Sequence, residues 1–120
     1  MIELKSDLGG GKTTLTRGIA KAAGSSDSVA SPTFTISKVY KAPSLSVYHF
    51  DFYRLQEAGL MAHELHDALE DPKGVVVVEW GDVVQDVLPQ DRITITIHKT
   101  SEGGRVISCV YPEAMRYLFV

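Results

Sequence analysis

The residues of this chain that could most plainly do chemistry form a glycine run followed by a cation and two hydroxyls. They are Gly9, Gly10, Gly11, Lys12, Thr13 and Thr14. Glycines let backbone N–H groups converge on an anion, and a helix that starts after them adds the positive end of its dipole. In such a loop the lysine reaches the terminal phosphates and the Thr13 hydroxyl holds Mg²⁺. The sequence therefore predicts binding of a nucleoside triphosphate.

One position departs from the full phosphate-loop pattern, G-x-x-x-x-G-K-S/T. The first glycine of that pattern would stand where this chain has Ser6. If position 6 required a positive φ, a non-glycine residue there would cost about 1 kcal/mol. The flanking segments still fit a strand, a loop and a helix, because residues 2–5 alternate and residues 12–23 carry apolar side chains at helical spacing before Gly24.

A second polar group lies in residues 48–54. As an extended strand this segment places His49, Asp51 and Tyr53 on one side and two phenylalanines on the other. Three hydrogen-bonding side chains in a row are costly in a core strand unless they meet a ligand, a metal or one another. Arg54 could neutralise charge on a γ-phosphoryl group or contact a partner. A hydrogen-bonded strand end with a surface arginine is the alternative.

An acid follows the valine run of residues 75–78, which suits a central parallel strand covered on both faces. At the carboxyl end of such a strand, Glu79 would assist Mg²⁺ or the attacking water; a surface glutamate is the alternative. Trp80 either packs in the core or covers the nucleotide. A hydroxyl in the loop at residues 31–35, such as that of Thr33, could sense the γ-phosphate, or the segment could simply begin a strand.

The elements that must position these residues alternate between strand and helix along 120 residues. Further strands are expected at residues 33–40, 45–50, 92–98 and 105–111, and further helices at 60–69, 82–88 and 113–118. We predict one compact α/β domain spanning residues 1–120, a P-loop NTPase-like mixed sheet flanked by helices. The strands at the phosphate loop and at residues 75–78 should be parallel, with antiparallel strands toward the C-terminus.

Composition narrows the class of protein. The net charge is −3 and no lysine or arginine run occurs, which disfavours strong direct nucleic-acid binding. No signal peptide is recognisable and no apolar run is long enough to span a bilayer, so we expect a cytoplasmic protein. The single cysteine, Cys109, excludes an internal disulfide and reads as a buried thiol. His63 and His66 read as part of a solvated helix face, not as metal ligands.

Four segments in this order and spacing resemble the motifs of the TsaE (YjeE) ATPases, small P-loop proteins of bacterial tRNA threonylcarbamoyladenosine biosynthesis. They are residues 7–14, 31–35 and 49–54 and the pair Glu79–Trp80. The resemblance extends over about residues 2–97. It implies an ATPase that works with the proteins TsaD and TsaB, which attach a threonylcarbamoyl group to the adenosine next to the anticodon. The tRNA would then be contacted indirectly, through that complex.

The resemblance also implies ATP and Mg²⁺ as cofactors and assigns roles by motif position. The residues implied to bind ATP are Gly9, Gly10, Gly11, Lys12, Thr13, Thr14 and Thr33. Those implied to hold Mg²⁺ are Thr13 and Glu79. The catalytic set, needed for hydrolysis or its coupling to the partners, is Lys12, Asp51, Tyr53, Arg54, Glu79 and Trp80.

Three features depart from the family pattern. Ser6 replaces a glycine, and Gly81 stands where proline often follows the Glu-Trp pair. The family normally carries a further strand and helix before the phosphate-loop strand, so either the start is truncated or the adenine pocket is reduced. Ser6 and the missing N-terminal elements favour an alternative, a nucleotide-gated interaction module with little hydrolysis. A small P-loop kinase is a third hypothesis, disfavoured by the short chain and by the absence of an obvious lid or basic substrate pocket.

Overall fold

Strands and helices alternate along the chain, as the apolar spacing predicts. The computed structural model describes residues 1–6, 10–30, 36–53 and 59–119. Its strands are β1 (Ile2–Lys5), β2 (Ser37–Lys41), β3 (Ser46–Asp51), β4 (Gly74–Glu79), β5 (Ile93–Lys99) and β6 (Arg105–Val110). Its helices are α1 (Lys12–Ala23), α2 (Gly59–Glu70) and two 3-10 helices, η1 (Gly81–Val87) and η2 (Glu113–Phe119).

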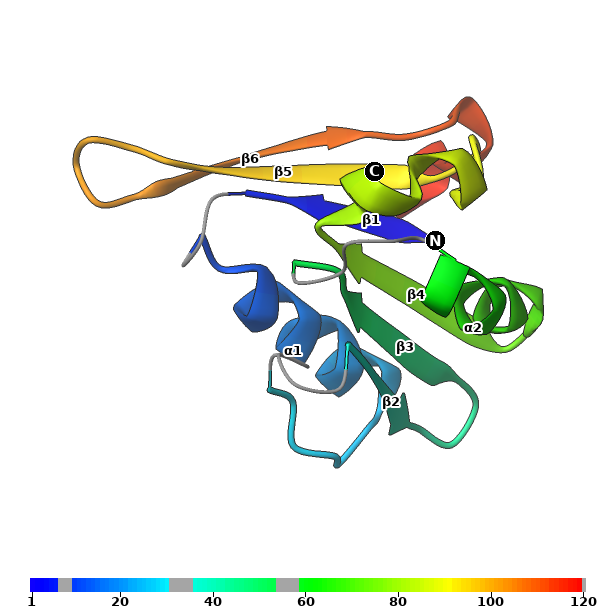
Figure 1. Ribbon diagram of the computed structural model, residues 1–120. Helices are drawn as coiled ribbons and strands as arrows, with labels where there is room; N and C mark the ends of the chain where they lie inside the picture. Colours follow the sequence, from blue (N-terminus) through cyan, green and yellow to red (C-terminus); the bar gives the residue numbers. More distant parts are fainter. Residues whose placement is uncertain (7–9, 31–35, 54–58, 120) are drawn as a thin grey trace.

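The strands form one sheet in the order β2-β3-β4-β1-β5-β6 (Figure 1). Strand β4 lies between β3 and β1 and is parallel to both, which confirms the central parallel strand expected for residues 75–78. The edge strands β2 and β6 are antiparallel to their neighbours. The C-terminal strands β5 and β6 form an antiparallel pair, as expected, and β5 also pairs with β1 in parallel. Because the segment containing η1 returns the chain to the starting end of the sheet, β5 runs in the same direction as β1.

Two apolar cores form, one on each face of the sheet. The core on the α1 face includes Leu4, Ala20, Val47 and Val77. The core on the α2 face includes Phe50, Leu65, Val76 and Val78. Since successive side chains of a strand point to opposite faces, the valines of β4 supply both cores. The result is the predicted α/β class, a mixed sheet flanked by helices.

Some predicted boundaries and helix types change. The strand expected from residue 33 begins at Ser37 in the described part of the chain, and residues 31–35 lie outside it. The short helices expected at residues 82–88 and 113–118 are both 3-10 helices. In η1, Val84 has a φ of −113° and a ψ of 19°, outside the helical range, and Leu88 is extended. A segment this short and kinked closes i→i+3 turns instead of a regular α-helix.

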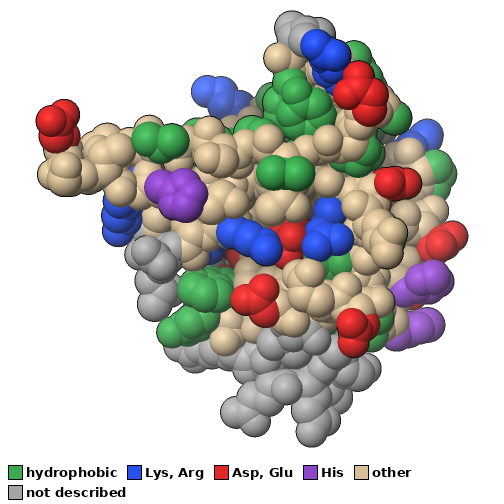
Figure 2. Space-filling model, turned by 90° about the horizontal axis from the view of Figure 1, so that it is seen from above, with side chains coloured by type: hydrophobic (Ala, Val, Ile, Leu, Met, Phe, Trp, Pro, Cys, Tyr) green, Lys and Arg blue, Asp and Glu red, His purple; other side chains and the backbone are tan. Residues whose placement is uncertain are grey.

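The β5–β6 hairpin extends beyond the rest of the sheet (Figure 1). Most of β6 is exposed, and Cys109 is only partly buried, so the expectation of a buried core thiol is wrong. Hydrophobic side chains are visible along this side of the molecule and gather near the C-terminal segment (Figure 2). The exposed ones include Val106, Ile107, Val110 and Tyr117. Within the described residues, no helix has both the length and the apolar character needed to cross a membrane.

Candidate functional site

The phosphate-loop segment leads directly into α1. Gly11 has a φ of 108°, in the left-handed region, and is the N-cap residue of the helix. Its carbonyl accepts the first helical hydrogen bond, from the Leu15 N–H at 3.0 Å. A Cβ at Gly11 would meet no atom within 4 Å, so the backbone torsion, not space, is what requires glycine here. Thr13 and Thr14 follow in the first turn, at the positive end of the helix dipole.

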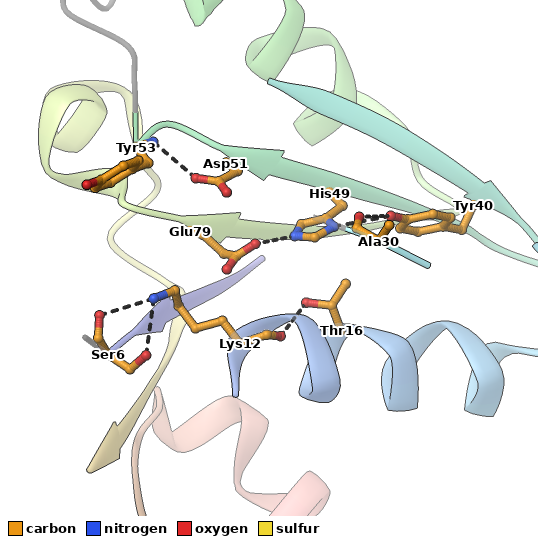
Figure 3. Close-up of polar contacts among 9 residues, drawn as sticks. All are labelled: Ser6, Lys12, Thr16, Ala30, Tyr40, His49, Asp51, Tyr53 and Glu79. Atoms are coloured by element: carbon orange, nitrogen blue, oxygen red, sulfur yellow. Dashed lines mark hydrogen bonds and ion pairs between the residues drawn. The ribbon is translucent and has the colours of Figure 1, made fainter. Parts of the chain in front are cut away.

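Lys12 points back to the end of β1. Its Nζ donates to the backbone oxygen and to the hydroxyl of Ser6, each at 3.1 Å (Figure 3). The same Nζ lies 4.5 Å from the centre of the Trp80 ring. The lysine is only 6% exposed. The departure at position 6 carries no backbone strain, because the non-glycine residues with positive φ in the described chain are Ile36 and Trp80. The ammonium group is thus held beside the loop by an oxygen pair and an aromatic ring.

The carboxyl ends of three parallel strands meet at this edge of the sheet. Glu79 ends β4 and is paired in register with Leu4 of β1 and with Asp51 of β3. Its side chain is turned to the α1 face, the face of Val77, and is 2% exposed. Since the next residue, Trp80, contacts Lys12, the acid and the lysine lie at the same edge. In open α/β sheets this edge is where ligands bind.

Glu79 is the first member of a buried chain of hydrogen bonds. Its Oε2 lies 2.5 Å from Nε2 of His49, and Nδ1 of His49 lies 3.4 Å from the hydroxyl of Tyr40 (Figure 3). The Tyr40 hydroxyl donates to the carbonyl of Ala30 at 2.9 Å. Burial raises the pKa of Tyr40; the Ala30 bond lowers it, and the charge of Glu79 raises it further. The strand pattern of residues 48–54 predicts that His49 lies on the same face as Asp51 and Tyr53, but it assigns no role to His49.

Asp51, Tyr53 and Trp80 form the outer part of the site. The Tyr53 N–H donates to Oδ1 of Asp51 at 3.0 Å, and the Tyr53 and Trp80 rings lie 5.0 Å apart at 51°. Trp80 has a φ of 56°, a costly conformation for a bulky residue and one that is common at functional sites. Trp80 packs partly against the core on the α2 face, one of the two roles predicted for it, and it also contacts Lys12.

Several predicted site residues cannot be placed. Gly9, Thr33 and Arg54 lie outside the described residues.

Thr16 is a buried residue near the site that the sequence pattern did not indicate. It is fully buried, and its hydroxyl donates to the Lys12 carbonyl at 2.9 Å (Figure 3). This bond to the carbonyl four residues earlier satisfies the buried hydroxyl.

A cavity of about 170 Å³ opens beside Lys12. Ser6, Lys12, Trp80 and Asp82 are among the residues that line it. It is smaller than the ~300–1,000 Å³ typical of small-molecule sites. The cavity therefore has room for a phosphate-sized group beside the Lys12 ammonium.

The residues predicted to hold a metal present only oxygen atoms. Mg²⁺ is usually bound through one or two protein oxygens together with substrate phosphates and water, so a threonine hydroxyl and a carboxylate fit it. In the described parts of the chain, no three His, Cys, Asp or Glu side chains gather in a cluster that could hold a metal ion by itself. His63 and His66 pair with Asp67 and Glu70 on the exposed face of α2, as a solvated helix face would.

Gly81, the residue after Trp80, sits in a confined position. A Cβ there would lie 3.0 Å from Oε2 of Glu3 and 3.2 Å from Leu88. Any side chain, including that of the proline common in the resembled family, would press on these atoms. Glycine therefore fits at position 81 without displacing the neighbouring side chains.

Comparison with known proteins gives a consistent result. Residues 1–107 match the family model described as "Threonylcarbamoyl adenosine biosynthesis protein TsaE". Proteins named "tRNA threonylcarbamoyladenosine biosynthesis protein TsaE" are similar to this chain. The one from Bacillus subtilis is 38% identical over 109 residues, 90% of this chain and 67% of that protein. The one from Haemophilus influenzae is 35% identical over 97 residues, 81% and 61% of the two chains.

A solved structure has the same fold. The crystal structure of YdiB from Bacillus subtilis superposes with a TM-score of 0.76 at 32% identity, covering 98% of this chain and 72% of that one. The Streptomyces coelicolor relative of the same name is 41% identical over 106 residues, 82% of this chain and 68% of its own length. The chain thus spans about two thirds of the length of the curated relatives it matches.

Proposed function

The chain belongs to the TsaE family of threonylcarbamoyl adenosine biosynthesis proteins, and we propose on that basis that it is a Mg²⁺-dependent ATPase serving this tRNA modification. The observation that carries the proposal is the meeting of Lys12, Glu79 and Trp80 at one sheet edge, beside the N-terminus of α1. A buried cation, a buried acid and a helix N-terminus at the carboxyl ends of parallel strands are what a triphosphate with a divalent ion needs.

In this proposal each part of the site has one task. The loop amides and the first turn of α1 bind the phosphates, with Gly9, Gly10, Gly11 and Thr14 in the cradle and Thr33 near the γ-phosphate. Thr13 and Glu79 would hold Mg²⁺, which supplies charge neutralisation between the phosphates when bound. The remaining roles, positioning the attacking water and coupling to partners, go to Asp51, Tyr53, Arg54 and Trp80.

Lys12 must change partners when nucleotide binds. Its Nζ now donates to two oxygens of Ser6, and a phosphate oxygen would replace at least one of them. A charge-assisted bond to phosphate is stronger than one to a neutral hydroxyl, so the exchange favours binding. The Trp80 ring, 4.5 Å from Nζ, guides the lysine as it moves.

We assign the partners from the family. The protein would bind to the complex of TsaB and TsaD, and it would contact tRNA only through that complex. The net charge of −3 supports this division, because a protein that bound tRNA alone would be expected to carry a basic face. We propose that the protein acts in the cytoplasm.

A second candidate, a nucleotide-gated interaction module that hardly hydrolyses ATP, is favoured by one observation. The Ser6 hydroxyl holds Lys12 in a position that a glycine could not provide, which lowers the gain from phosphate binding. Binding without turnover would follow if Lys12 did not reach the γ-phosphate in the bound state.

Calorimetry of ATP with and without Mg²⁺ tests the proposal, followed by single-turnover hydrolysis with and without TsaB and TsaD. Lys12→Ala should abolish binding, whereas Lys21→Ala, an exposed lysine at the other end of α1, should not. Phosphate release in the wild-type protein supports the ATPase. Binding without phosphate release under either condition supports the module, and no binding at all rejects both.

A further inference from the structure

The buried histidine behind Glu79 has no assigned role, and both of its ring nitrogens are engaged. His49 is 0% exposed and lies on β3, on the face of the sheet that α1 covers. Nε2 faces Oε2 of Glu79 at 2.5 Å, and Nδ1 faces the Tyr40 hydroxyl at 3.4 Å. The other three histidines of the chain are exposed. His49 is therefore set apart by burial and by its contact with the acid.

The direction of the bond to Glu79 follows from the hydrogen-bonding groups. An ionised carboxylate has acceptors only, so the imidazole Nε2–H must be the donor. On the other side, Tyr40 bonds the Ala30 carbonyl at 2.9 Å and is itself 2% exposed, so the ring that backs His49 is fixed. The chain of contacts runs from Glu79 away from Lys12, through His49 to Tyr40 on the edge strand β2 (Figure 3).

A fixed histidine restricts the carboxylate it bonds. A glutamate side chain has three rotatable bonds, and holding it in one rotamer has an entropic cost that must otherwise be met when the metal binds. A bond to Oε2 that already exists fixes the plane of the carboxylate, and with it the direction of Oε1. Groups that hold a metal-binding carboxylate in this way typically change metal affinity about 10–100-fold when they are removed.

We propose that His49 is a positioning residue that presets the Glu79 carboxylate for the Mg²⁺ of the nucleotide complex. The proposal rests on the proposed function, because it needs Glu79 to meet the metal. A histidine that merely filled the core would also stabilise the fold, so loss of stability on substitution does not distinguish the two roles. Dependence on Mg²⁺ concentration does, because a packing role would leave it unchanged.

The test compares His49→Gln with His49→Leu. The glutamine amide can still donate toward Glu79, whereas leucine fills similar space with no donor. Trp80, the single tryptophan of the chain, lies beside Lys12 and reports ATP binding by its fluorescence. In His49→Leu, the Mg²⁺ concentration that gives half-maximal enhancement of ATP binding should rise about tenfold or more, with ATP affinity in EDTA unchanged. His49→Gln should stay within about threefold of wild type.

Two further measurements keep the proposal testable if His49→Leu does not fold. Tyr40→Phe removes only the hydroxyl behind Nδ1, and the Mg²⁺ midpoint should rise about threefold. In the ligand-free wild-type protein, NMR should show a strongly downfield, slowly exchanging proton on the His49 Nε2, which Glu79→Gln should move upfield. An unchanged Mg²⁺ midpoint in every folded variant, or no such proton, overturns the proposal. If wild-type binding itself ignores Mg²⁺, the proposed function fails first and this inference fails with it.

Discussion

Two glutamates are buried on adjacent parallel strands, and their surroundings differ. Glu3 of β1 is 1% exposed and Glu79 of β4 is 2% exposed. Glu3 accepts from Arg92 Nε at 3.1 Å and from Gln85 Nε2 at 2.7 Å, on the face of the sheet where η1 packs. Glu79 accepts from His49 on the opposite face, at the end of its strand.

The difference lies in the groups that bond the two carboxylates. Arg92 compensates the charge of Glu3 directly and is itself tied to the Pro89 carbonyl and to Gln85, so the network is closed within the protein. On the Glu79 side, the Lys12 ammonium group donates to two oxygens of Ser6 and lies over the Trp80 ring. Burial alone does not mark a functional carboxylate. In the part of the chain that the structure describes, Glu79 bonds His49 and not a guanidinium, and its place at the carboxyl end of a parallel strand fits the role proposed for it.

The largest expected effect is on Glu79. Glu79→Gln keeps an oxygen for the His49 bond but removes the negative charge, so hydrolysis should fall about 10²–10³-fold with little change in stability. Single-turnover phosphate release and thermal unfolding measure the two quantities. Glu70→Gln, at an exposed position of α2, is the matched control and should leave both unchanged. A large loss of stability in Glu79→Gln would make Glu79 structural, like Glu3.

The converse result is expected at Glu3. Glu3→Gln leaves Arg92 partly buried without its counter-charge, and the free energy of unfolding should fall by about 2–3 kcal/mol. ATP hydrolysis per folded molecule should be unchanged. Urea unfolding gives the first quantity, with Glu113→Gln as a control, because its bond to Arg116 is exposed and should contribute less than about 0.5 kcal/mol. Loss of ATP hydrolysis in a folded Glu3→Gln variant would contradict a purely structural role for Glu3.

A smaller effect is expected at Ser6, whose two oxygens accept hydrogen bonds from the Lys12 ammonium group. Ser6→Gly removes one acceptor of Lys12, so ATP should bind up to about fivefold more tightly, equivalent to about 1 kcal/mol. Trp80 fluorescence measures the affinity. Ser6→Ala removes the same hydroxyl but keeps the β-carbon and should give the same gain. A gain seen only with glycine would point to loop freedom instead of the lost hydrogen bond.

The smallest expected effect concerns a third carboxylate, the half-buried Asp71. The hydroxyl of Tyr48 donates to Oδ2 of Asp71 at 2.6 Å, and this bond lowers the pKa of Asp71. A carboxylate with a lowered folded-state pKa stabilises the protein above its unfolded pKa, and the contribution is lost as pH falls below about 4. Tyr48→Phe should therefore be less stable than wild type at neutral pH, and the difference should shrink on acidification. Chemical unfolding from pH 7 to pH 3 measures it; parallel curves would contradict the assignment.

Local sequence patterns predicted the parts of the site that depend on neighbouring residues. The glycine run before Lys12 predicted a helix N-terminus, and the unbroken valines before Glu79 predicted a strand buried on both faces. Both predictions are confirmed, because backbone conformation and burial on both faces of a strand depend on the types of consecutive residues.

The parts that depend on distant residues could not be read in this way. The His49–Glu79 bond joins positions 30 apart, and it follows from the parallel register of β3 and β4, which no local pattern specifies. The left-handed backbone of Trp80 and the parallel pairing of β5 with β1 likewise depend on how η1 leaves the sheet. Position 6 shows the same limit, since its departure from glycine proved to involve a side-chain contact, not a torsion.

The β6 edge has a practical consequence. Strand β6 ends the sheet and pairs on one side only among the described residues, and its exposed side chains include Val106, Ile107 and Val110. An apolar strand with open backbone donors and acceptors is a template for another strand, which natural proteins usually blunt with charge or proline. Self-association through this edge should set the concentration limit for handling the protein, and a lysine at position 107 should raise that limit without touching the nucleotide edge.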